Sequence, residues 1–408
     1  MNAVHEGDPR TGSYSGKKIG NGLVLAEIAL AFGLLVVSGL MIKDLILLQN
    51  RDSGMRVDHV LAFDLSPDGR RYQEESAVME FYHNFYSRLI QAKGITSAGL
   101  TSHLPMYRYG VNGEIQIEGG TPWEAKDAPL VEMRWLYGDY LKTIGVPLLR
   151  GRTLDARDGK GTHTALINRA MAEKFWPGKD PLGRKFWLST DSSQWSEVVG
   201  VVGNIRSFGL AYDARCEYYR PIDQSPFFDE MTMVIRVDQD EPKTIIPAVR
   251  QILASVDPTM PLSNAQTLED IVSASVGSSR LMSALTGLFG CLAGLISMMG
   301  IYSVTAYNVR RQRREFGVRI AMGAEQIDIV KLMVGRGLLL ALAGIIIGAI
   351  GARLLTGLLK AMIHDVKYTD PMIFAGTAAA VLAIVLLASY LPARSAARVD
   401  PVVVLRNE

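Results

Sequence analysis

The stretch Asn308–Ala324 reads NVRRQRREFGVRIAMGA and lies between two apolar runs that are each long enough to cross a membrane. Leu281–Val309 carries no charge, and another apolar run begins at Gly337. Five arginines fall within Arg310–Arg319, and each arginine costs roughly 2.5–3.5 kcal/mol at the centre of a bilayer. The stretch therefore predicts a loop between two spans, and the positive-inside bias predicts that this loop is cytoplasmic.

The bulk composition agrees with a membrane protein. The 408 residues are 48% hydrophobic, and their mean hydropathy is +0.15. The apolar residues concentrate in four runs, Ile19–Ile42, Leu281–Val309, Gly337–Leu359 and Pro371–Ala393. The net charge of +2 is close to neutral, so no nucleic-acid partner is expected.

Lysine and arginine next to the four runs predict the orientation. Arg10, Lys17 and Lys18 precede the first run, and Arg394, Arg398 and Arg406 follow the last. If the chain crosses the bilayer four times, these two groups and the arginine loop all lie on one side. This pattern predicts that both termini are cytoplasmic and that residues 50–280 lie outside.

The long polar middle of the chain predicts a folded domain, not a linker. Val60–Leu65, Thr164–Asn168, Glu197–Val202 and Met231–Val237 are typical of strands, whereas Gln73–Ala92, Tyr137–Ile144, Arg169–Phe175 and Lys243–Val256 are typical of helices. The fold class is therefore an α+β membrane protein, with four transmembrane helices and a large extracytoplasmic α+β domain between the first and the second.

The predicted organisation follows from these boundaries. Helical material at both edges of the external domain predicts a rigid stalk, and the polar, Gly- and Ser-rich leader predicts a segment without stable structure. The segments are a cytoplasmic leader at 1–18, the first span and stalk at 19–49, the external core domain at 50–266, stalk and second span at 267–309, a cytoplasmic loop at 310–336, the third span at 337–359, a short external loop at 360–370, the fourth span at 371–393 and a cytoplasmic tail at 394–408.

Motifs for catalysis or cofactor binding are not found. The pairs Gly16-Lys17 and Gly159-Lys160 lack both the upstream glycine and the following Ser or Thr of a nucleotide-binding loop. The six histidines show no metal-binding spacing. The sequence therefore predicts a chain that is not an enzyme and has no catalytic, metal or cofactor site of its own.

Two features of the apolar runs have competing interpretations. Glu27 is either a functional intramembrane charge or an interfacial carboxylate that pairs with a loop arginine. The G-x-x-x-G pairs Gly290/Gly294 and Gly344/Gly348 allow close helix approach, either within the chain or between two copies.

The arrangement of spans and several motifs resemble the MacB/FtsX-type permeases of ABC transporters, and in particular one module of the duplicated acidobacterial permeases. The motifs are EFGVRIAMGA at Glu315–Ala324, FWPGKDPLG at Phe175–Gly183, VVGVVG at Val198–Gly203 and the ending from Asp400. The resemblance implies a MacB-like periplasmic core domain. It also implies that the loop docks on an ATPase through Arg314, Glu315, Phe316, Gly317, Val318, Arg319, Ala321, Met322, Gly323 and Ala324.

The resemblance further implies a function and a set of partners. The chain would be a permease subunit in the bacterial inner membrane that couples ATP hydrolysis by a separate ATPase to movement of its periplasmic domain, for efflux or export of a drug, peptide or lipoprotein. ATP and Mg²⁺ would be held by that ATPase, not by this chain. A second permease module, as a homodimer or a paired half, is expected, and a periplasmic adaptor or an outer-membrane partner is compatible with the family.

A receptor or sensor is the alternative function. An external α+β domain on membrane helices would equally suit ligand binding outside the cell. A receptor would need a cytoplasmic signalling domain, and only fifteen residues follow Ala393.

Overall fold

The computed structural model describes residues 10–67, 70–120, 129–188, 195–224, 230–312, 315–316, 318–319, 322–323, 325–358 and 370–397. The chain divides into two compact units. The helical unit consists of Met1–Leu47 and Ser278–Glu408, and the sheet unit consists of Leu48–Gly277.

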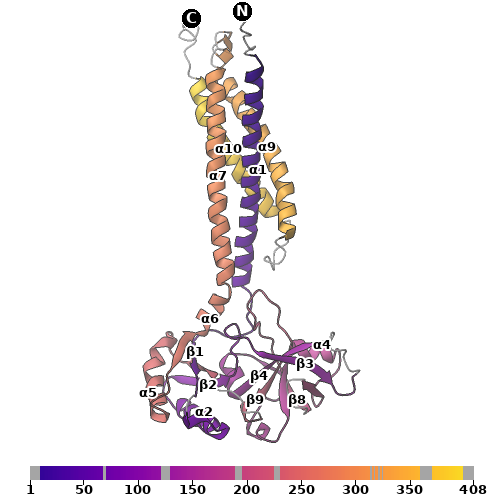
Figure 1. Cartoon of the computed structure of the whole chain (residues 1–408), viewed down its shortest axis with the longest axis vertical. Coiled ribbons are helices and arrows are strands. Elements are labelled where there is room, and N and C mark those ends of the chain that lie inside the picture. The colour runs from indigo at the N-terminus through magenta and orange to yellow at the C-terminus, as the bar shows by residue number, and fades with distance from the viewer. Residues whose placement is uncertain are drawn as a thin grey trace, which may run out of the picture. The chain divides into compact units, whose positions relative to one another are not determined.

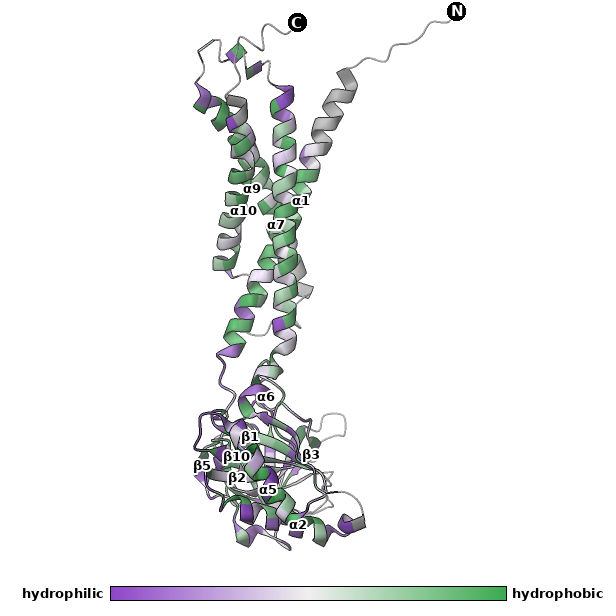
Figure 2. Cartoon of the chain, turned by 90° about the vertical axis from the view of Figure 1, so that its left-hand side faces the viewer, coloured by the Kyte–Doolittle hydropathy of each residue, from purple (hydrophilic) through white to green (hydrophobic). Residues whose placement is uncertain are grey.

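The helical unit is built from α1 (Arg10–Gln49), α7 (Gly277–Arg311), α9 (Gln326–Leu358) and α10 (Pro371–Ala397). Within the described residues, these four helices are long and apolar enough to cross a membrane. Colouring by hydropathy shows apolar residues along the helices and hydrophilic residues near their ends (Figure 2). The four predicted spans are therefore confirmed as helices of sufficient length.

The helices of this unit alternate in direction. At one end, Lys43 near the carboxyl end of α1 forms an ion pair with Asp370, which directly precedes α10. At the other end, Val309 of α7, Met333 of α9 and Ala393 of α10 share a buried cluster. In Figure 1, α1 and α7 lie side by side, and Ser283 of α7 donates a hydrogen bond to the carbonyl oxygen of Met41 on α1 (3.1 Å).

The leader departs from its prediction. α1 begins at Arg10, so residues 10–18 are helical and the prediction of an unstructured leader is wrong for them. Pro9 directly precedes the helix, and no proline interrupts it up to Gln49. Since adding a residue to an existing helix avoids the unfavourable nucleation step, the span can extend into a polar sequence that would not form a helix alone.

The sheet unit contains a mixed sheet of 11 strands among its described residues. The strands are β1 (Val60–Leu65), β2 (Ile95–Thr101), β3 (Val111–Ile117), β4 (Leu130–Gly138), β5 (Leu148–Gly151), β6 (Thr164–Asn168), β7 (Lys185–Leu188), β8 (Ser196–Val202), β9 (Glu217–Pro221), β10 (Met231–Val237) and β11 (Ser263–Thr267). The helices are α2 (Glu75–Leu89), α3 (Tyr140–Thr143), α4 (Arg169–Phe175), α5 (Ile246–Val256) and α6 (Leu268–Ser275), with short 3-10 turns η1 (Arg70–Tyr72), η2 (Ala156–Asp158), η3 (Ile222–Gln224) and η4 (Pro242–Ile245).

The strand order divides the sheet into two regions joined at β4. The sheet runs β11-β1-β10-β2-β4 and continues β3-β7-β8-β6-β9, and β9 then pairs with β4 in parallel. The strands β4, β3, β7, β8, β6 and β9 therefore form a closed ring, whereas β11, β1, β10 and β2 form an open extension.

The open extension buries both of its faces. Leu61, Phe63 and Leu65 of β1 pack with α2 and α5 in one core. Val60 and Ala62 of the same strand pack in a second core on the opposite face. This separation follows from the period of two along a strand, which sends successive side chains to opposite faces.

The structure confirms most of the predicted elements and corrects one. β1, β6, β10 and α4 have the predicted bounds, and the predicted strand at Glu197–Val202 begins one residue earlier. The predicted helix Tyr137–Ile144 is wrong at its start, because Tyr137 and Gly138 belong to β4 and only Tyr140–Thr143 is helical. Strand pairing with β2 overrides the local helix preference there.

The lead into the second span is interrupted. α6 ends at Ser275 and α7 begins at Gly277, so Val276 separates two helices where the sequence predicted continuous helical material. Val276 adopts φ −101 and ψ 8, outside the helical region.

A buried ion pair links β4 to β9, two neighbouring strands of the ring. Arg134 and Glu217 are 1% and 0% exposed, and their side chains lie 3.3 Å apart. Tyr219 donates a second hydrogen bond to Glu217 (2.7 Å). Burial penalises the guanidinium charge, but Glu217 and its neighbours more than offset this, so the pKa of Arg134 lies above its usual value.

Glu217→Ala should destabilise the sheet unit by about 3–5 kcal/mol, because it leaves the Arg134 charge buried and uncompensated. Urea unfolding of the full chain in detergent micelles, followed by tryptophan fluorescence, measures the change. Glu197→Ala is the matched control, since Glu197 is exposed on β8, and should change the stability by less than about 0.5 kcal/mol. Equal losses in the two variants would contradict a special role for the buried pair.

Candidate docking surface at one end of the helix bundle

The segment between α7 and α9 is anchored to the bundle by Phe316. This side chain is 1% exposed and packs with Val309 of α7, Ile329 and Met333 of α9 and Ala393 of α10. Its backbone N–H donates to the carbonyl oxygen of Gln312 (3.0 Å), which continues the helical hydrogen-bond pattern past Arg311. One side of the segment is therefore held by three helices at once.

The other side of the segment faces solvent. Glu315, Val318, Arg319 and Met322 follow the spacing i, i+3, i+4, i+7, which places four residues on one helix face. Met322 is 83% exposed and Val318 is 43% exposed. Arg319 and Glu315 form an ion pair (2.5 Å), and the N–H of Met322 donates to the carbonyl oxygen of Val318 (3.0 Å). These four residues are called the exposed stripe below.

Gly323 ends the segment before α9 begins. Its φ is +95°, in the left-handed region that residues with a Cβ rarely adopt. No heavy atom lies within 4 Å of the position of an added Cβ, so the glycine is required by the backbone conformation and not by lack of space.

The predicted docking residues divide into three groups. Phe316 is turned into the bundle, whereas Glu315, Val318, Arg319 and Met322 are exposed, and Gly323 forms the turn. Arg314, Gly317, Ala321 and Ala324 lie outside the described residues. Sequence reasoning named Phe316 with the others and had no means to separate an anchor from a contact residue.

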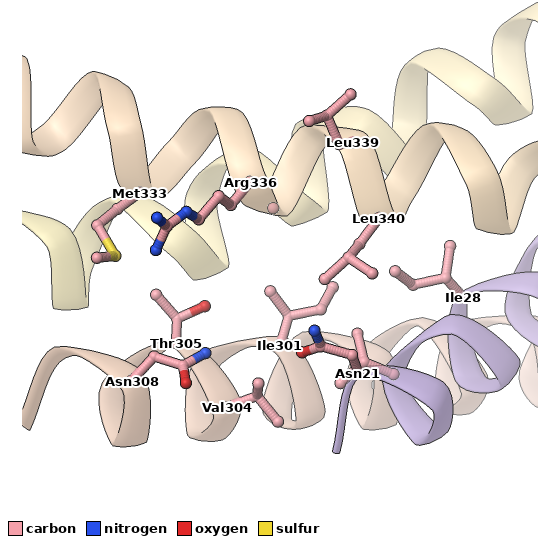
Figure 3. A pocket seen from close by; sticks show the side chains of 12 residues that line it. Asn21, Ile28, Ile301, Val304, Thr305, Asn308, Met333, Arg336, Leu339 and Leu340 are labelled. Carbon is pink, nitrogen blue, oxygen red and sulfur yellow. The ribbon is translucent and has the colours of Figure 1, made fainter. Parts of the chain in front are cut away.

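A cavity of about 360 Å³ lies next to this surface, between α1, α7 and α9. Figure 3 shows Arg336 of α9 extending toward α7, near Thr305 and Asn308. Arg336 donates to the side-chain oxygen of Gln312 (3.3 Å). The polar groups thus lie at the same end of the bundle as the exposed Arg310 and Arg311.

Glu27 packs against α7 and forms no ion pair among the described residues. Its backbone carbonyl accepts a hydrogen bond from Ser297 (3.1 Å). A Cβ on Gly300 would lie only 2.0 Å from Oε2 of Glu27, so this glycine makes room for the carboxylate. Oε2 is buried and has no hydrogen-bond partner in the described part of the chain. Pairing of Glu27 with a loop arginine stays a prediction, because Arg313 and Arg314 of the loop lie outside the described residues.

The four glycines of the G-x-x-x-G pairs lie against other helices of the same chain. A Cβ on Gly344 would lie 2.6 Å from Cγ2 of Ile28, and one on Gly348 would lie 2.6 Å from the carbonyl oxygen of Ala29. The other two contacts are looser. A Cβ on Gly290 would lie 3.2 Å from Cδ2 of Leu35 on α1, and one on Gly294 would lie 3.7 Å from Cδ1 of Ile384 on α10. The pair on α9 thus allows the backbones of α9 and α1 to come close together.

An ion pair that the sequence did not reveal lies at the opposite end of the bundle. Lys43 and Asp370 are distant in sequence and join α1 to the start of α10. The hydrogen bond from Lys43 is the main reason that the pKa of Asp370 lies below its usual value. A lysine that ends an apolar run was the only sequence signal for this contact.

Gly348→Ala should lower the stability of the helical unit by about 1–3 kcal/mol, the usual cost of overpacking, because the new methyl group meets backbone that cannot rotate away. Thermal unfolding in detergent, followed by the helical circular-dichroism signal, measures the change. Gly351→Ala is the matched control on the same helix, since nothing lies within 4 Å of its added Cβ. Close approach of α9 and α1 would be refuted by equal unfolding midpoints for the two variants.

The C-terminal part of the chain matches a known family of permeases. Residues 287–401 match the family described as FtsX-like permease C-terminal, and this range contains the exposed stripe. The macrolide export ATP-binding/permease protein MacB of Agrobacterium fabrum is 26% identical over 283 residues, which cover 66% of this chain and 42% of that protein. The chain carries an FtsX-like permease domain and resembles the MacB-type permeases. With its four apolar helices, this permease is a multi-pass membrane protein with an extracytoplasmic domain.

Further similarities are shorter or weaker. The pyoverdine export ATP-binding/permease protein PvdT of Pseudomonas entomophila is 30% identical over 138 residues, or 34% of this chain and 21% of that protein. The crystal structure of the periplasmic region of MacB from Actinobacillus actinomycetemcomitans aligns with a TM-score of 0.37 and 12% identity, over 54% of this chain and 94% of that one. The permease spans about two fifths of the length of the MacB relative from Agrobacterium fabrum (42%).

Proposed function

We propose that this permease couples ATP hydrolysis by a separate ATPase subunit to movement of its external domain, within an ABC transporter that exports a drug, peptide or lipoprotein. The exposed stripe is the observation that carries the proposal. It offers two apolar side chains, Val318 and Met322, beside the Glu315–Arg319 ion pair, on a segment that Phe316 holds against three helices.

A surface of this kind suits the transfer of force. The buried cluster around Phe316 would prevent the segment from moving independently of α7, α9 and α10. α7 has 35 residues, so it extends over roughly 52 Å at 1.5 Å per residue. A displacement at the stripe would therefore reach the start of α7, where the sheet unit ends, along a single helix.

The orientation belongs to the same proposal. Arg310, Arg311, Arg336 and Arg394 lie near the end of the bundle that carries the stripe. Positive residues are retained on the cytoplasmic side of membranes. Both termini and the stripe would then be cytoplasmic, in the inner membrane of a bacterium, and the sheet unit would be periplasmic.

The proposed partners follow from the family. ATP and Mg²⁺ would be bound by the ATPase subunit, and a second permease module would complete the transporter, as another copy of this chain or a paired half. A periplasmic adaptor or an outer-membrane protein would receive the exported molecule. The relatives named for macrolide and pyoverdine export support an exported substrate, which is proposed here as a drug, peptide or lipoprotein.

Met322→Asp and Val318→Asp should each abolish or strongly reduce binding of the partner ATPase subunit. Each change would bury an unpaired carboxylate in the docked interface, at a cost of about 2–5 kcal/mol. A cost of this size lowers the affinity roughly 30-fold or more. Co-purification and ATP turnover of the complex in lipid nanodiscs measure the loss.

Lys331→Glu is the control for these variants. Lys331 is exposed on α9 and lies outside the stripe, so its reversal should leave ATPase binding unchanged. The docking assignment fails if the stripe variants bind normally, or if Lys331→Glu is equally damaging while all three proteins remain folded.

A flexible Gly/Ser insertion should separate ATP turnover from movement of the external domain. Suitable positions are directly after Asn50 and before Arg280, next to the break at Val276. ATP-dependent changes in the distance between spin labels at position 80 of two permease copies report the movement. The chain without an insertion should show an ATP-dependent change in this distance. The insertion variants should show no such change, although they still bind the ATPase. An unchanged response after insertion would rule out transmission through rigid helices.

A further inference from the structure

The sheet unit contains a cavity of about 1280 Å³ that the coupling proposal does not use. One wall is formed by α2 and by the end of β4 with α3. The facing wall is the η2 turn with its flanking loops, and Leu166 and Pro221 also line the space. Pockets for drug-sized ligands usually measure about 300–1,000 Å³, so this cavity can hold a large organic molecule.

Three aromatic rings form the first wall. Tyr137 of β4 stacks on His83 of α2, with ring centroids 4.6 Å apart and planes inclined by 23°. Tyr86, one helical turn further along α2, meets Tyr137 edge to face at 5.0 Å. Gly138 has φ +65°, and a Cβ on it would lie 2.3 Å from the ring of Tyr86. The absence of a side chain at Gly138 therefore leaves room for the ring of Tyr86 beside Tyr137.

The facing wall is held rigidly by an internal ion pair. Arg152 donates two hydrogen bonds to Asp158 (2.6 and 2.7 Å), and Asp158 is only 1% exposed. The N–H of Asp155 donates to the same carboxylate (2.9 Å), which closes a capping box around η2. This wall is thus formed before any ligand arrives.

Gln224 provides an unused acceptor at the cavity. Its Nε2 donates to the carbonyl oxygens of Asp158 (2.9 Å) and Thr164 (3.1 Å), and these contacts identify the nitrogen of the amide. Oε1 is buried and has no hydrogen-bond partner among the described residues.

The charges around the cavity are mainly negative. Asp223 lies 3.1 Å from His83, and a histidine offsets a carboxylate only when it is protonated. Of the lysines, Lys142 already pairs with Asp139 (3.2 Å). The carboxylates that line the cavity are Glu74, Glu75, Asp139, Asp155 and Asp223, against the lysines Lys142 and Lys160. Asp155 is paired with Arg157 (2.6 Å), which lies outside the lining, so Glu74, Glu75 and Asp223 are the carboxylates without a lysine or arginine partner among the described residues.

Electrostatics at the aromatic wall favour a positive ligand. Burial, followed by the nearby Asp223 carboxylate, raises the pKa of Tyr137, so its phenol stays neutral at physiological pH. Neutral aromatic faces attract cations. No group of three or more His, Cys, Asp or Glu among the described residues is arranged to hold a metal ion, which favours an organic cation.

We propose that this cavity binds an amphiphilic molecule with an aromatic or aliphatic body and an amine or guanidinium group. The body would lie against Tyr137 and Tyr86, and the cation would meet Asp223. The binding site is independent of the docking of an ATPase, because every residue that forms it belongs to the sheet unit.

Rhodamine 6G is a suitable probe because it is a cationic aromatic amphiphile with strong fluorescence. The full chain in phosphatidylcholine nanodiscs, without any ATPase, should raise the anisotropy of the dye saturably above that seen with empty nanodiscs. Asp223→Asn should weaken binding by roughly tenfold, the order expected for loss of one charge-assisted contact. Tyr137→Leu should weaken it by a similar factor through loss of the aromatic face.

The controls distinguish binding in the cavity from nonspecific electrostatic attraction of the dye. Glu80→Gln removes a carboxylate from the same helix α2 outside the cavity lining, and should leave the affinity unchanged. Sulforhodamine B, an anionic dye of related shape, should not bind. The proposal is overturned by absence of saturable rhodamine 6G binding, by equal binding of the anionic dye, or by equal effects of Asp223→Asn and Glu80→Gln. Since Asp223→Asn changes one atom type only, it keeps the test valid if Tyr137→Leu fails to fold.

Discussion

Close backbone contact with α1 is the constraint on which the helical unit depends. In lipid, helices gain little from burying apolar side chains, because the lipid tails are equally apolar. Their association therefore relies on small residues that bring backbones together. Gly348 meets the carbonyl oxygen of Ala29, and Gly300 leaves room for the carboxylate of Glu27. Both α9 and α7 thus pack on α1, and larger residues at these positions would force them apart.

This packing gives significance to the small cluster at the end of the bundle. Phe316 is buried among α7, α9 and α10, so a short segment rich in charge is held to helices that are held to each other. The exposed stripe then becomes a defined surface, because one face of the segment is used by the bundle and the other is left for solvent. A loop without such an anchor could bind a partner but could not transfer its movement to α7.

The sheet unit, by contrast, folds around hydrophobic cores of its own. β4 belongs both to the open extension and to the closed ring, and the Arg134–Glu217 pair joins it to β9. The large cavity lies beside the end of this strand, where Tyr137 meets α2 and where η3 follows β9. The same junction that holds the two regions together therefore also creates the space between them.

The sequence predicted those features that depend on neighbours along the chain. Apolar runs gave the four spans, the arginines marked one end of them, and alternation of apolar residues located strands such as Val60–Leu65 with the correct bounds. Motifs around Glu315 indicated the family. Each of these signals lies within a short stretch, and local periodicity and charge are sufficient to read it.

Other features depend on residues that meet only in three dimensions. Glu27 and Ser297 are 270 positions apart, and Tyr137 joins a strand because β2 lies beside it, although its own neighbours favour a helix. The sequence by itself determined which segments enter the membrane and which stay outside. Only the tertiary structure decided that Phe316 points inward while Met322 points outward, and that α2 and η2 enclose a cavity, because burial is a property of the packed elements and not of any one of them.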